Sequence, residues 1–265
     1  MAKSWPGAAS AGAAYDQSGL SVDFPEALLE GVLIRRYQRF LADVRLADGC
    51  VVTAYTPNTG SMKGCCDPGS RVWLSDSHSA TRKYPLTWEL VETASGTLVG
   101  INTGLSNKLV GEAIDNGTIS ELQDYDRVRS EVRYGRENSR IDLLLQKGEG
   151  NACYVEVKNV TLVKGDAAYF PDAVTIRGSK HLRELAAMRE QGRRAVIFFC
   201  VQRADALQMR PADCIDPVYA ARLRDAITAG VEAYAYKADV TLSGIALRHA
   251  IPVLPERQMC QENSD

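Results

Sequence analysis

The chain has 265 residues, of which 45% are hydrophobic and 24% are charged, with 31 basic and 33 acidic side chains. These ordinary fractions exclude collagen-like and broadly disordered proteins. The formal net charge of −2 excludes a uniformly basic, histone-like DNA-binding protein. Any contact with nucleic acid must therefore depend on a local patch of charge or on a metal ion.

The sequence predicts neither a membrane segment nor an export signal. The longest strongly apolar run, AVIFFCV at 195–201, is far shorter than the roughly 20 residues of a spanning helix. Residues 1–23 are rich in small side chains and lack an apolar core, so we expect a disordered tail. The seven cysteines form no CxxC pair, which favours reduced thiols in a cytoplasmic protein over a zinc site.

Residues 24–104 show the alternating pattern of an all-β domain. Short runs of Val, Thr, Tyr and Trp each end at Gly, Asn, Asp or Pro. The runs are GVLIRRYQRF, LADVRLADG, CVVTAYTP, RVWLSDS, LTWELVET and TLVGINTG. Five or six short strands in about 80 residues predict a small closed barrel, because closure removes exposed sheet edges.

Basic and aromatic side chains gather in the first run of this barrel. Arg35, Arg36 and Arg39 surround Tyr37, and oligonucleotide-binding (OB) barrels present this mixture of cations and rings to phosphates and bases. A charged edge strand that faces solvent explains the same residues equally well. The four residues are therefore candidates for DNA binding, with a solvated edge as the alternative.

The loop NTGSMKG at 58–64 is a second candidate in the barrel. Its glycines leave open amides that suit a phosphate, and Lys63 adds a positive charge, although ordinary turn chemistry also explains the loop. The motifs GxxxxGK[ST], GxGxxG and GxSxG are absent from the sequence. Their absence disfavours P-loop nucleotide hydrolysis, hydride transfer and α/β-hydrolase chemistry.

After residue 104 the hydrophobic period changes to that of an α/β domain. A helix in LSNKLVGEAIDNG, with Ser106 as its cap, precedes three strand-like runs, SEVRYG, SRIDLLL and ACYVEVKNVTLV. A long helix at 175–191, a buried strand in AVIFFCVQ, a helix in DPVYAARLRDAITAG and a last strand in VEAYAYKADVT follow. This order predicts an α/β domain over residues 105–254, before a polar tail at 255–265.

The run YVEVKN places a carboxylate and an ammonium group on one face of a strand. Glu156 and Lys158 alternate there with Val155 and Val157. Asp142 interrupts the apolar run SRIDLLL, and a hairpin between the two runs would bring it close to Glu156. Two close carboxylates repel each other unless they share a proton or a cation such as Mg²⁺. The alternative is a half-exposed Glu–Lys pair, worth at most about 1 kcal/mol.

The order and spacing of these residues resemble the PD-(D/E)XK nuclease superfamily. More narrowly, four segments resemble the SfsA family, the bacterial sugar fermentation stimulation proteins: NTGSMKG, SRIDLLL, EVKNVTL and FPDAVTIRGSKHLREL. The resemblance runs from about Leu28 to Leu254. It implies an N-terminal OB-like β-barrel, a restriction-endonuclease-like α/β domain, a cytoplasmic location and largely non-specific binding of double- or single-stranded DNA.

The resemblance also implies roles for individual residues. Asp142 and Glu156 match carboxylates that bind Mg²⁺ or Mn²⁺, and Lys158 matches the catalytic lysine. The superfamily uses a further glutamate on the first helix of the core. Glu112 is the candidate and Glu131, on the following strand, is its rival, because the spacing does not decide between them.

The long helix adds a stripe of polar side chains. Arg177, Lys180, His181 and Glu184 lie at helical offsets of 0, 3, 4 and 7, so they share one face. A cationic stripe beside a metal site suits a DNA backbone, whereas a surface histidine on an amphipathic helix is the plainer explanation of His181. Asp172 lies either at the edge of a cleft or in a capped turn.

Three functions follow from the sequence. The leading hypothesis is a DNA-binding protein that keeps a Mg²⁺-dependent phosphodiesterase site of the PD-(D/E)XK deoxyribonuclease type. The second is a non-catalytic DNA-binding regulator of sugar metabolism of the maltose type, since a nuclease fold can be kept for binding alone. The third is a barrel that binds a sugar or a protein, with the acidic residues around a structural ion.

Overall fold

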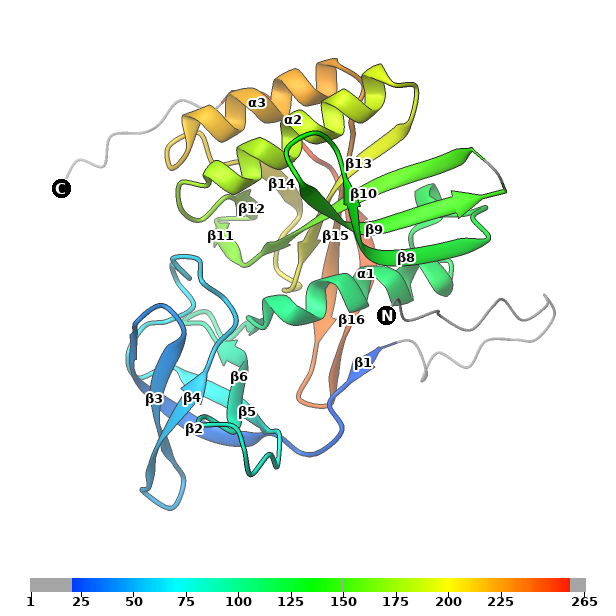
Figure 1. Ribbon diagram of the computed structural model, residues 1–265. Helices are drawn as coiled ribbons and strands as arrows, with labels where there is room; N and C mark the ends of the chain where they lie inside the picture. Colours follow the sequence, from blue (N-terminus) through cyan, green and yellow to red (C-terminus); the bar gives the residue numbers. More distant parts are fainter. Residues whose placement is uncertain (1–20, 149, 258–265) are drawn as a thin grey trace.

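The computed structural model describes residues 21–148 and 150–257, and it places a β-barrel beside a larger α/β domain (Figure 1). The predicted tail over residues 1–20 and the last part of the predicted C-terminal tail lie outside the described residues. Within the described part of the chain, no helix has both the length and the apolar character needed to cross a membrane.

The barrel has the strand order β4-β3-β2-β5-β6-β7. The strands are β2 (Leu29–Tyr37), β3 (Leu41–Leu46), β4 (Val51–Tyr55), β5 (Arg71–Asp76), β6 (Leu86–Glu92) and β7 (Leu98–Gly100). Strand β4 also pairs with β6 through Tyr55 and Thr87, which closes five strands into a ring. Leu33, Leu74 and Trp88 fill the interior and are at most 1% exposed. The predicted OB-like barrel is confirmed.

The α/β domain has a seven-stranded mixed sheet in the order β1-β16-β15-β13-β10-β9-β8. Its strands are β1 (Val22–Asp23), β8 (Arg127–Tyr134), β9 (Ser139–Lys147), β10 (Asn151–Val160), β13 (Arg194–Val201), β15 (Glu232–Val240) and β16 (Gly244–Ile251). Helix α1 (Ser106–Asp115) packs on one face, and α2 (Ile176–Glu190) and α3 (Pro217–Thr228) cover the other (Figure 1). The run AVIFFCV is buried throughout because both faces of central strand β13 are covered.

Local sequence explains where two of the helices begin. Thr175 caps α2, since its hydroxyl accepts the backbone N–H of Gly178, and Asp216 caps α3 in the same way through Tyr219. The predicted cap of α1 is wrong. Ser106 is the first helical residue, and its hydroxyl donates to Asn159 Oδ1 at 3.2 Å instead.

The structure adds strands that the sequence pattern did not predict. Strand β1 lies in residues assigned to the tail, and β16 follows the strand expected to be the last. Three further short strands, β11 (Leu162–Lys164), β12 (Ala167–Phe170) and β14 (Gln208–Pro211), form a small separate sheet. Runs this short carry too few alternations to show a period. The expectation of reduced thiols fails at Cys214, which is disulfide-bonded, whereas Cys50, Cys65, Cys66, Cys153 and Cys200 are free.

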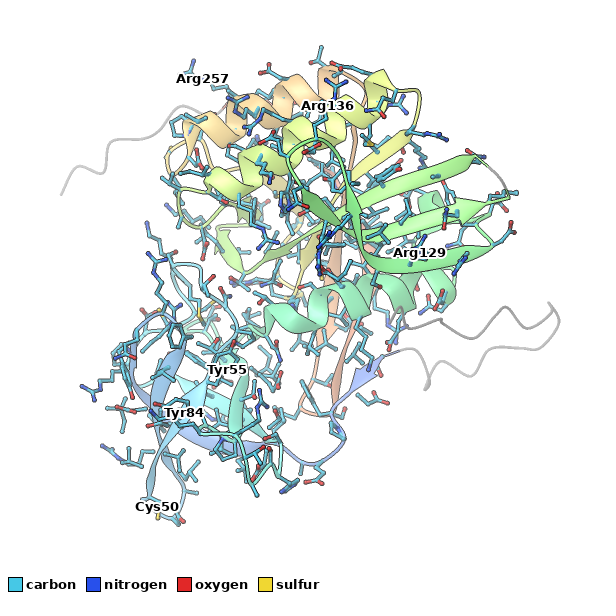
Figure 2. All side chains as sticks on the ribbon, viewed as in Figure 1. Cys50, Tyr55, Tyr84, Arg129, Arg136 and Arg257 are labelled. Carbon is cyan, nitrogen blue, oxygen red and sulfur yellow. The ribbon has the colours of Figure 1, made fainter. Side chains whose placement is uncertain are left out.

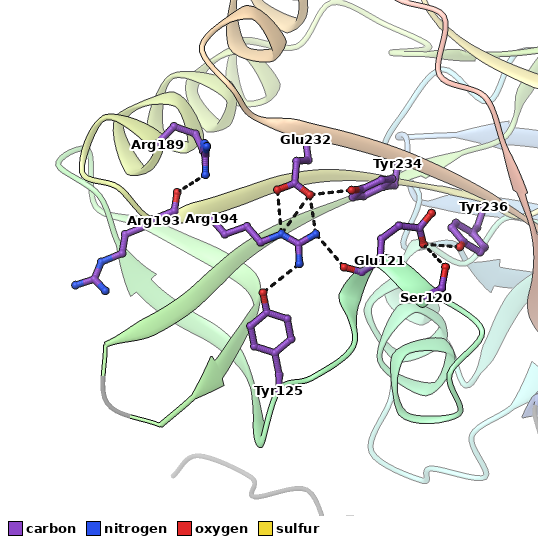
Figure 3. A network of polar contacts seen from close by, with 9 residues as sticks. All are labelled: Ser120, Glu121, Tyr125, Arg189, Arg193, Arg194, Glu232, Tyr234 and Tyr236. Carbon is purple, nitrogen blue, oxygen red and sulfur yellow. Dashed lines mark hydrogen bonds and ion pairs between the residues drawn. The ribbon is translucent and has the colours of Figure 1, made fainter.

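A polar network ties the connection between α1 and β8 to the sheet (Figure 3). Arg194, at the start of β13, donates to Glu232 Oε2 at 2.6 Å, to Tyr125 Oη at 3.1 Å and to the carbonyl of Glu121 at 2.9 Å. The hydroxyl of Tyr234 donates to the same Glu232 oxygen at 2.8 Å. One guanidinium therefore joins two strands and a loop at the edge of the domain.

Candidate active site

A cleft of about 750 Å³ lies between the barrel and the α/β domain. The barrel contributes Arg36, Arg39 and residues 57–61 to its walls. The α/β domain contributes Asn107, Asp142 and residues 157–161 and 169–175. Parts of all four sequence segments that resemble the SfsA family therefore line one cavity.

Asp142 lies where β9 leaves its regular pairing with β10. Its Oδ2 accepts the backbone N–H of Val157 at 2.7 Å, and its Oδ1 accepts the side-chain amide of Asn107 at 3.1 Å. Burial raises the pKa of Asp142 to about 6, and the charge of Glu156 adds to the rise although Lys158 opposes it. The two carboxylates therefore lie close enough for the charge of Glu156 to act on Asp142.

Glu156 lies behind the cleft wall and is only 1% exposed. Its Oε1 accepts from Lys158 Nζ at 2.6 Å and also contacts His181 Nδ1, whereas its buried Oε2 has no partner in the described part of the chain. Burial opposes ionisation of this carboxyl, yet Lys158 and His181 bring its pKa below the ordinary value. Glu156 is thus held as a carboxylate with one oxygen unused.

His181 reaches this cluster from α2. Arg177 Nε donates to His181 Nε2 at 3.3 Å, which assigns the ring proton to Nδ1. His181 Nδ1 and Lys158 Nζ are then both donors to Glu156 Oε1. His181 is 5% exposed, so the plainer prediction of a surface histidine is wrong. The side chain positions Glu156 from behind instead of facing solvent.

The donor set fits a hard divalent cation. Mg²⁺ usually takes one or two protein carboxylates and completes its shell with water and phosphate oxygens. Asp142 and the unpartnered Oε2 of Glu156 supply oxygen ligands of this kind. No group of three His, Cys, Asp or Glu side chains able to hold a metal is found in residues 21–148 and 150–257, so protein side chains alone would supply two carboxylates at most here.

The third predicted carboxylate does not join this cluster. Glu112 lies 3.6 Å from Lys108, and its other charged neighbours are Asp23 and Asp115. The residue of α1 that reaches Asp142 is Asn107, which sequence reasoning missed. Five positions along a helix correspond to a rotation of about 140°, so Asn107 and Glu112 point in different directions.

The rival glutamate, Glu131, lies opposite Asp142 in the sheet, but its side chain faces solvent. Glu131 on β8 occupies the position opposite Asp142, in a gap between the pairs Ser130–Leu143 and Val132–Ile141. Its side chain is exposed, and its φ of 57° lies in the left-handed region. Neither Glu112 nor Glu131 contacts Glu156.

The predicted barrel residues divide between two faces. Arg36 and Arg39 line the cleft, whereas Arg35 and Tyr37 bind Asp43 at 2.8 and 3.0 Å on the other face, with Arg35 stacked over the Tyr37 ring. Arg36 donates to the carbonyls of residues 58 and 60 at 2.9 Å, so it holds the loop in place. Strand alternation along β2 separates Arg36 from Arg35 and Tyr37, whereas Arg39 lies in the turn after the strand, with a left-handed φ of 66°.

Three further predicted cations lie outside the cleft lining. Lys63 is exposed in the loop, and Lys180 on α2 donates to the carbonyl of Glu137 at 2.5 Å. Arg177 is exposed, does not line the cleft and donates to His181. The predicted helix stripe is therefore not one surface, because His181 and Glu184 point inward.

Asp172 joins the two domains. Its Oδ2 accepts the backbone N–H of Met62 at 2.8 Å, and its carbonyl accepts the hydroxyl of Ser61 at 2.6 Å. Gly60 lies against the same carboxylate. The two segments NTGSMKG and FPDAVTIRG, which are about 110 residues apart in sequence, thus meet at the cleft.

We expect Gly60→Ala to destabilise the protein by about 1–3 kcal/mol, because the new Cβ has no room. It would lie 2.6 and 2.7 Å from the two carboxylate oxygens of Asp172, which the N–H of Met62 holds in place. Gly111→Ala in α1 is the control, since nothing lies within 4 Å of its Cβ and alanine favours a helix. Urea unfolding measures the stability of both variants. Equal stability of Gly60→Ala and Gly111→Ala would contradict tight packing of Gly60 against Asp172.

The stability of the protein should fall as Asp142 ionises. The pKa of Asp142 is raised from 3.8 to about 6, so the folded protein holds the carboxyl proton more tightly than the unfolded chain does. The stability contributed by the protonated carboxyl is fully present below about pH 4 and is lost as pH rises through about 6. This shift corresponds to about 3 kcal/mol. Between about pH 4 and pH 7, the free energy of unfolding of wild type should therefore fall by about 3 kcal/mol more than that of Asp142→Asn. If the stability of the two proteins changed with pH in the same way, the raised pKa of Asp142 would be contradicted.

The fold and the cluster define a class of two-domain proteins, in which an OB barrel precedes a restriction-endonuclease-like α/β core. The model of the SfsA N-terminal OB domain matches residues 34–101, and that of the sugar fermentation stimulation protein RE domain matches residues 104–244. The chain belongs to the SfsA family of sugar fermentation stimulation proteins.

Relatives and a solved structure agree with this assignment. The sugar fermentation stimulation protein homolog of Geobacter sulfurreducens is 63% identical over 230 residues, which cover 87% of this chain and 97% of that protein. The homolog of Thioalkalivibrio sulfidiphilus is 58% identical over 233 residues, covering 88% and 98%. A structure described as Pyrococcus furiosus SfsA in complex with Ca²⁺ is similar with a TM-score of 0.81 and 28% identity, covering 89% of this chain and 100% of that one.

Proposed function

We propose that the chain acts in the cytoplasm, binds DNA in the cleft between its domains and hydrolyses phosphodiester bonds there with Mg²⁺ or Mn²⁺. The observation that supports this most is the joining of Asp142, Glu156 and Lys158 at one wall of a cleft whose other wall carries Arg39. The Ca²⁺ complex of the Pyrococcus protein supports a hard divalent cation, because Ca²⁺ and Mg²⁺ both take oxygen ligands.

Each residue of the cluster has a distinct task in this proposal. Asp142 and Glu156 Oε2 would hold the cation, which when bound activates water and offsets phosphate charge. Lys158 Nζ, which lines the cleft, donates to a phosphate oxygen or orients the attacking water. His181 keeps Glu156 Oε1 engaged, so that Oε2 stays directed away from the ring.

The barrel wall supplies the positive charge for the backbone. Arg39 is exposed and lines the cleft; its backbone carbonyl accepts from Arg36, but its guanidinium makes no hydrogen bond or ion pair with the described residues. Arg36 shapes the loop beside it through backbone carbonyls. The unpaired guanidinium of Arg39 is suited to bind a phosphate, whereas that of Arg36 is already bound to carbonyls and stabilises the loop.

Titration of labelled DNA with the purified protein tests the proposal. Anisotropy should report an affinity that falls steeply between about 50 and 200 mM salt, because phosphate contacts release counterions. Adding Mg²⁺ to linear or single-stranded DNA should then yield cleavage products. An affinity independent of salt would contradict DNA binding, and bound but intact DNA would contradict hydrolysis.

The name of the relatives, sugar fermentation stimulation protein homolog, favours a second candidate, a non-catalytic DNA-binding protein that regulates sugar metabolism. Both candidate functions place DNA in the cleft, and they differ in whether the protein cleaves that DNA. Intact DNA after long incubation with Mg²⁺, together with salt-dependent binding, would support this second function over the first.

A further inference from the structure

The hairpin of β8 and β9 carries an excess of positive charge that the proposed site does not use. Residues 127–140 contain five arginines, at positions 127, 129, 133, 136 and 140, and only two acidic residues, Glu131 and Glu137. None of the five arginines lines the cleft. Figure 2 labels two of them, Arg129 along β8 and Arg136 at the turn beside α2.

Two of these arginines face each other directly. Arg133 on β8 is the register partner of Arg140 on β9. Both side chains are exposed, and neither makes a hydrogen bond or an ion pair with any other residue that the structure describes. Like charges directly opposite each other destabilise an antiparallel pair, so nothing in the fold itself explains this arrangement.

The acidic residues of the hairpin do not offset the pair. Glu137 is engaged by α2, since its Oε2 lies 3.0 Å from Arg183 Nη2 and Arg183 Nε also donates to its other oxygen. Glu131 lies two residues from Arg133 on β8, and Asp142 lies two residues from Arg140 on β9. None of these carboxylates forms an ion pair with Arg133 or Arg140 among the described residues, so both guanidinium groups remain unpaired.

The hairpin is held firmly in place despite this repulsion. Glu184 of α2, which is 2% exposed, accepts the backbone N–H groups of Arg136 at 3.0 Å and of Glu137 at 2.5 Å. Gly135 lies so close that a Cβ there would overlap the Glu184 carboxylate. A buried carboxylate thus fixes the turn, and the arginines are presented on a rigid frame.

We infer that the β8–β9 hairpin is a second phosphate-binding surface, on which Arg133 and Arg140 hold the backbone of duplex DNA beside the cleft. Arg140 precedes Asp142 by two residues on β9, a separation of about 7 Å. A duplex seated in the cleft would pass over this pair, and guanidinium groups suit phosphates through paired hydrogen bonds. The inference rests on the proposed function and extends it to residues outside the cleft.

The test compares the double variant Arg133→Gln/Arg140→Gln with wild type by anisotropy on a duplex of about 20 base pairs. We expect the affinity to fall at least about ten-fold at low salt and the slope of log K against log salt to decrease by about 2. A short single strand that only fills the cleft should bind both proteins equally. The melting temperature should stay equal or rise, because a like-charge pair is removed.

Arg45→Gln/Arg257→Gln is the matched control. It removes the same two charges from exposed positions that neither lie on the hairpin nor line the cleft, and its salt slope should match that of wild type. If wild type binds duplex and the Arg133/Arg140 variant binds it equally well, the inference is overturned and the proposed function stands. If wild type shows no salt-dependent binding, both are overturned. A lower melting temperature of the Arg133/Arg140 variant would assign the pair a structural role and also overturn the inference.

Discussion

Replacing Asp142 with Asn is expected to lower Mg²⁺-dependent DNA hydrolysis by about 10²- to 10³-fold, the usual effect of losing one group that stabilises developing charge. The amide keeps an oxygen for the N–H of Val157 but loses the negative charge that a cation requires. DNA binding should change by no more than about two-fold in the absence of metal, because no phosphate contact is removed. Single-turnover cleavage and anisotropy on the same substrate separate the two effects.

Glu112→Gln is the control for this experiment. It also neutralises a half-buried carboxyl of the α/β domain whose pKa burial raises, but its charged neighbours are Lys108, Asp23 and Asp115. Its cleavage rate should equal that of wild type. If Glu112→Gln loses activity and Asp142→Asn keeps it, the cluster described here is not the site of hydrolysis.

The second large effect concerns stability. Glu156→Ala should lower the free energy of unfolding by about 3–5 kcal/mol, because removing one partner of a buried ion pair leaves the other charge uncompensated. Lys158, whose side chain is 11% exposed, would lose its carboxylate, and His181 would lose its acceptor. Urea denaturation followed by circular dichroism measures the change.

A second substitution tests the cause of this loss. In Glu156→Ala/Lys158→Met the unpaired ammonium is replaced by an apolar chain, so a large share of the lost stability should return. Glu156→Gln, which keeps an acceptor for both donors, should fall between wild type and Glu156→Ala. If the double variant is no more stable than Glu156→Ala, the ion pair is not what the carboxylate contributes.

Strand periodicity predicted most of the barrel and the cluster of Asp142, Glu156 and Lys158. In the barrel, Val72 and Leu74 of β5 and Leu86 and Trp88 of β6 point into the barrel core, as alternation predicts. Trp73 and Leu90 are buried on the opposite face, in the core of the α/β domain, which alternation does not predict. The pairing of β9 with β10 ends at Leu143 and Val155, and it leaves Asp142 and Glu156 as the next residues of the two strands, close together. These features are local or need only one hairpin.

Features that depend on packing between distant elements could not be predicted. Asn107 was missed because nothing in its residue type shows which part of α1 faces Asp142. The burial of His181 depends on how α2 rests on the sheet, and its polar neighbours in sequence suggested a surface. Likewise, alternation separates Arg35 from Arg36, but only the second domain decides which of them borders a cleft.

The short strand β1 changes how the two halves of the molecule are connected. Val22 and Asp23 pair with Ile245 and Gly244 of β16, and the N–H of Phe24 donates to the carbonyl of Ser243 at 2.9 Å. From residue 22 onward, the chain therefore adds a strand to the large sheet, leaves it to form the barrel and returns through residues 101–105. The barrel is inserted into the α/β domain and tethered at two points, so its wall of the cleft cannot swing about a single linker as an appended domain can.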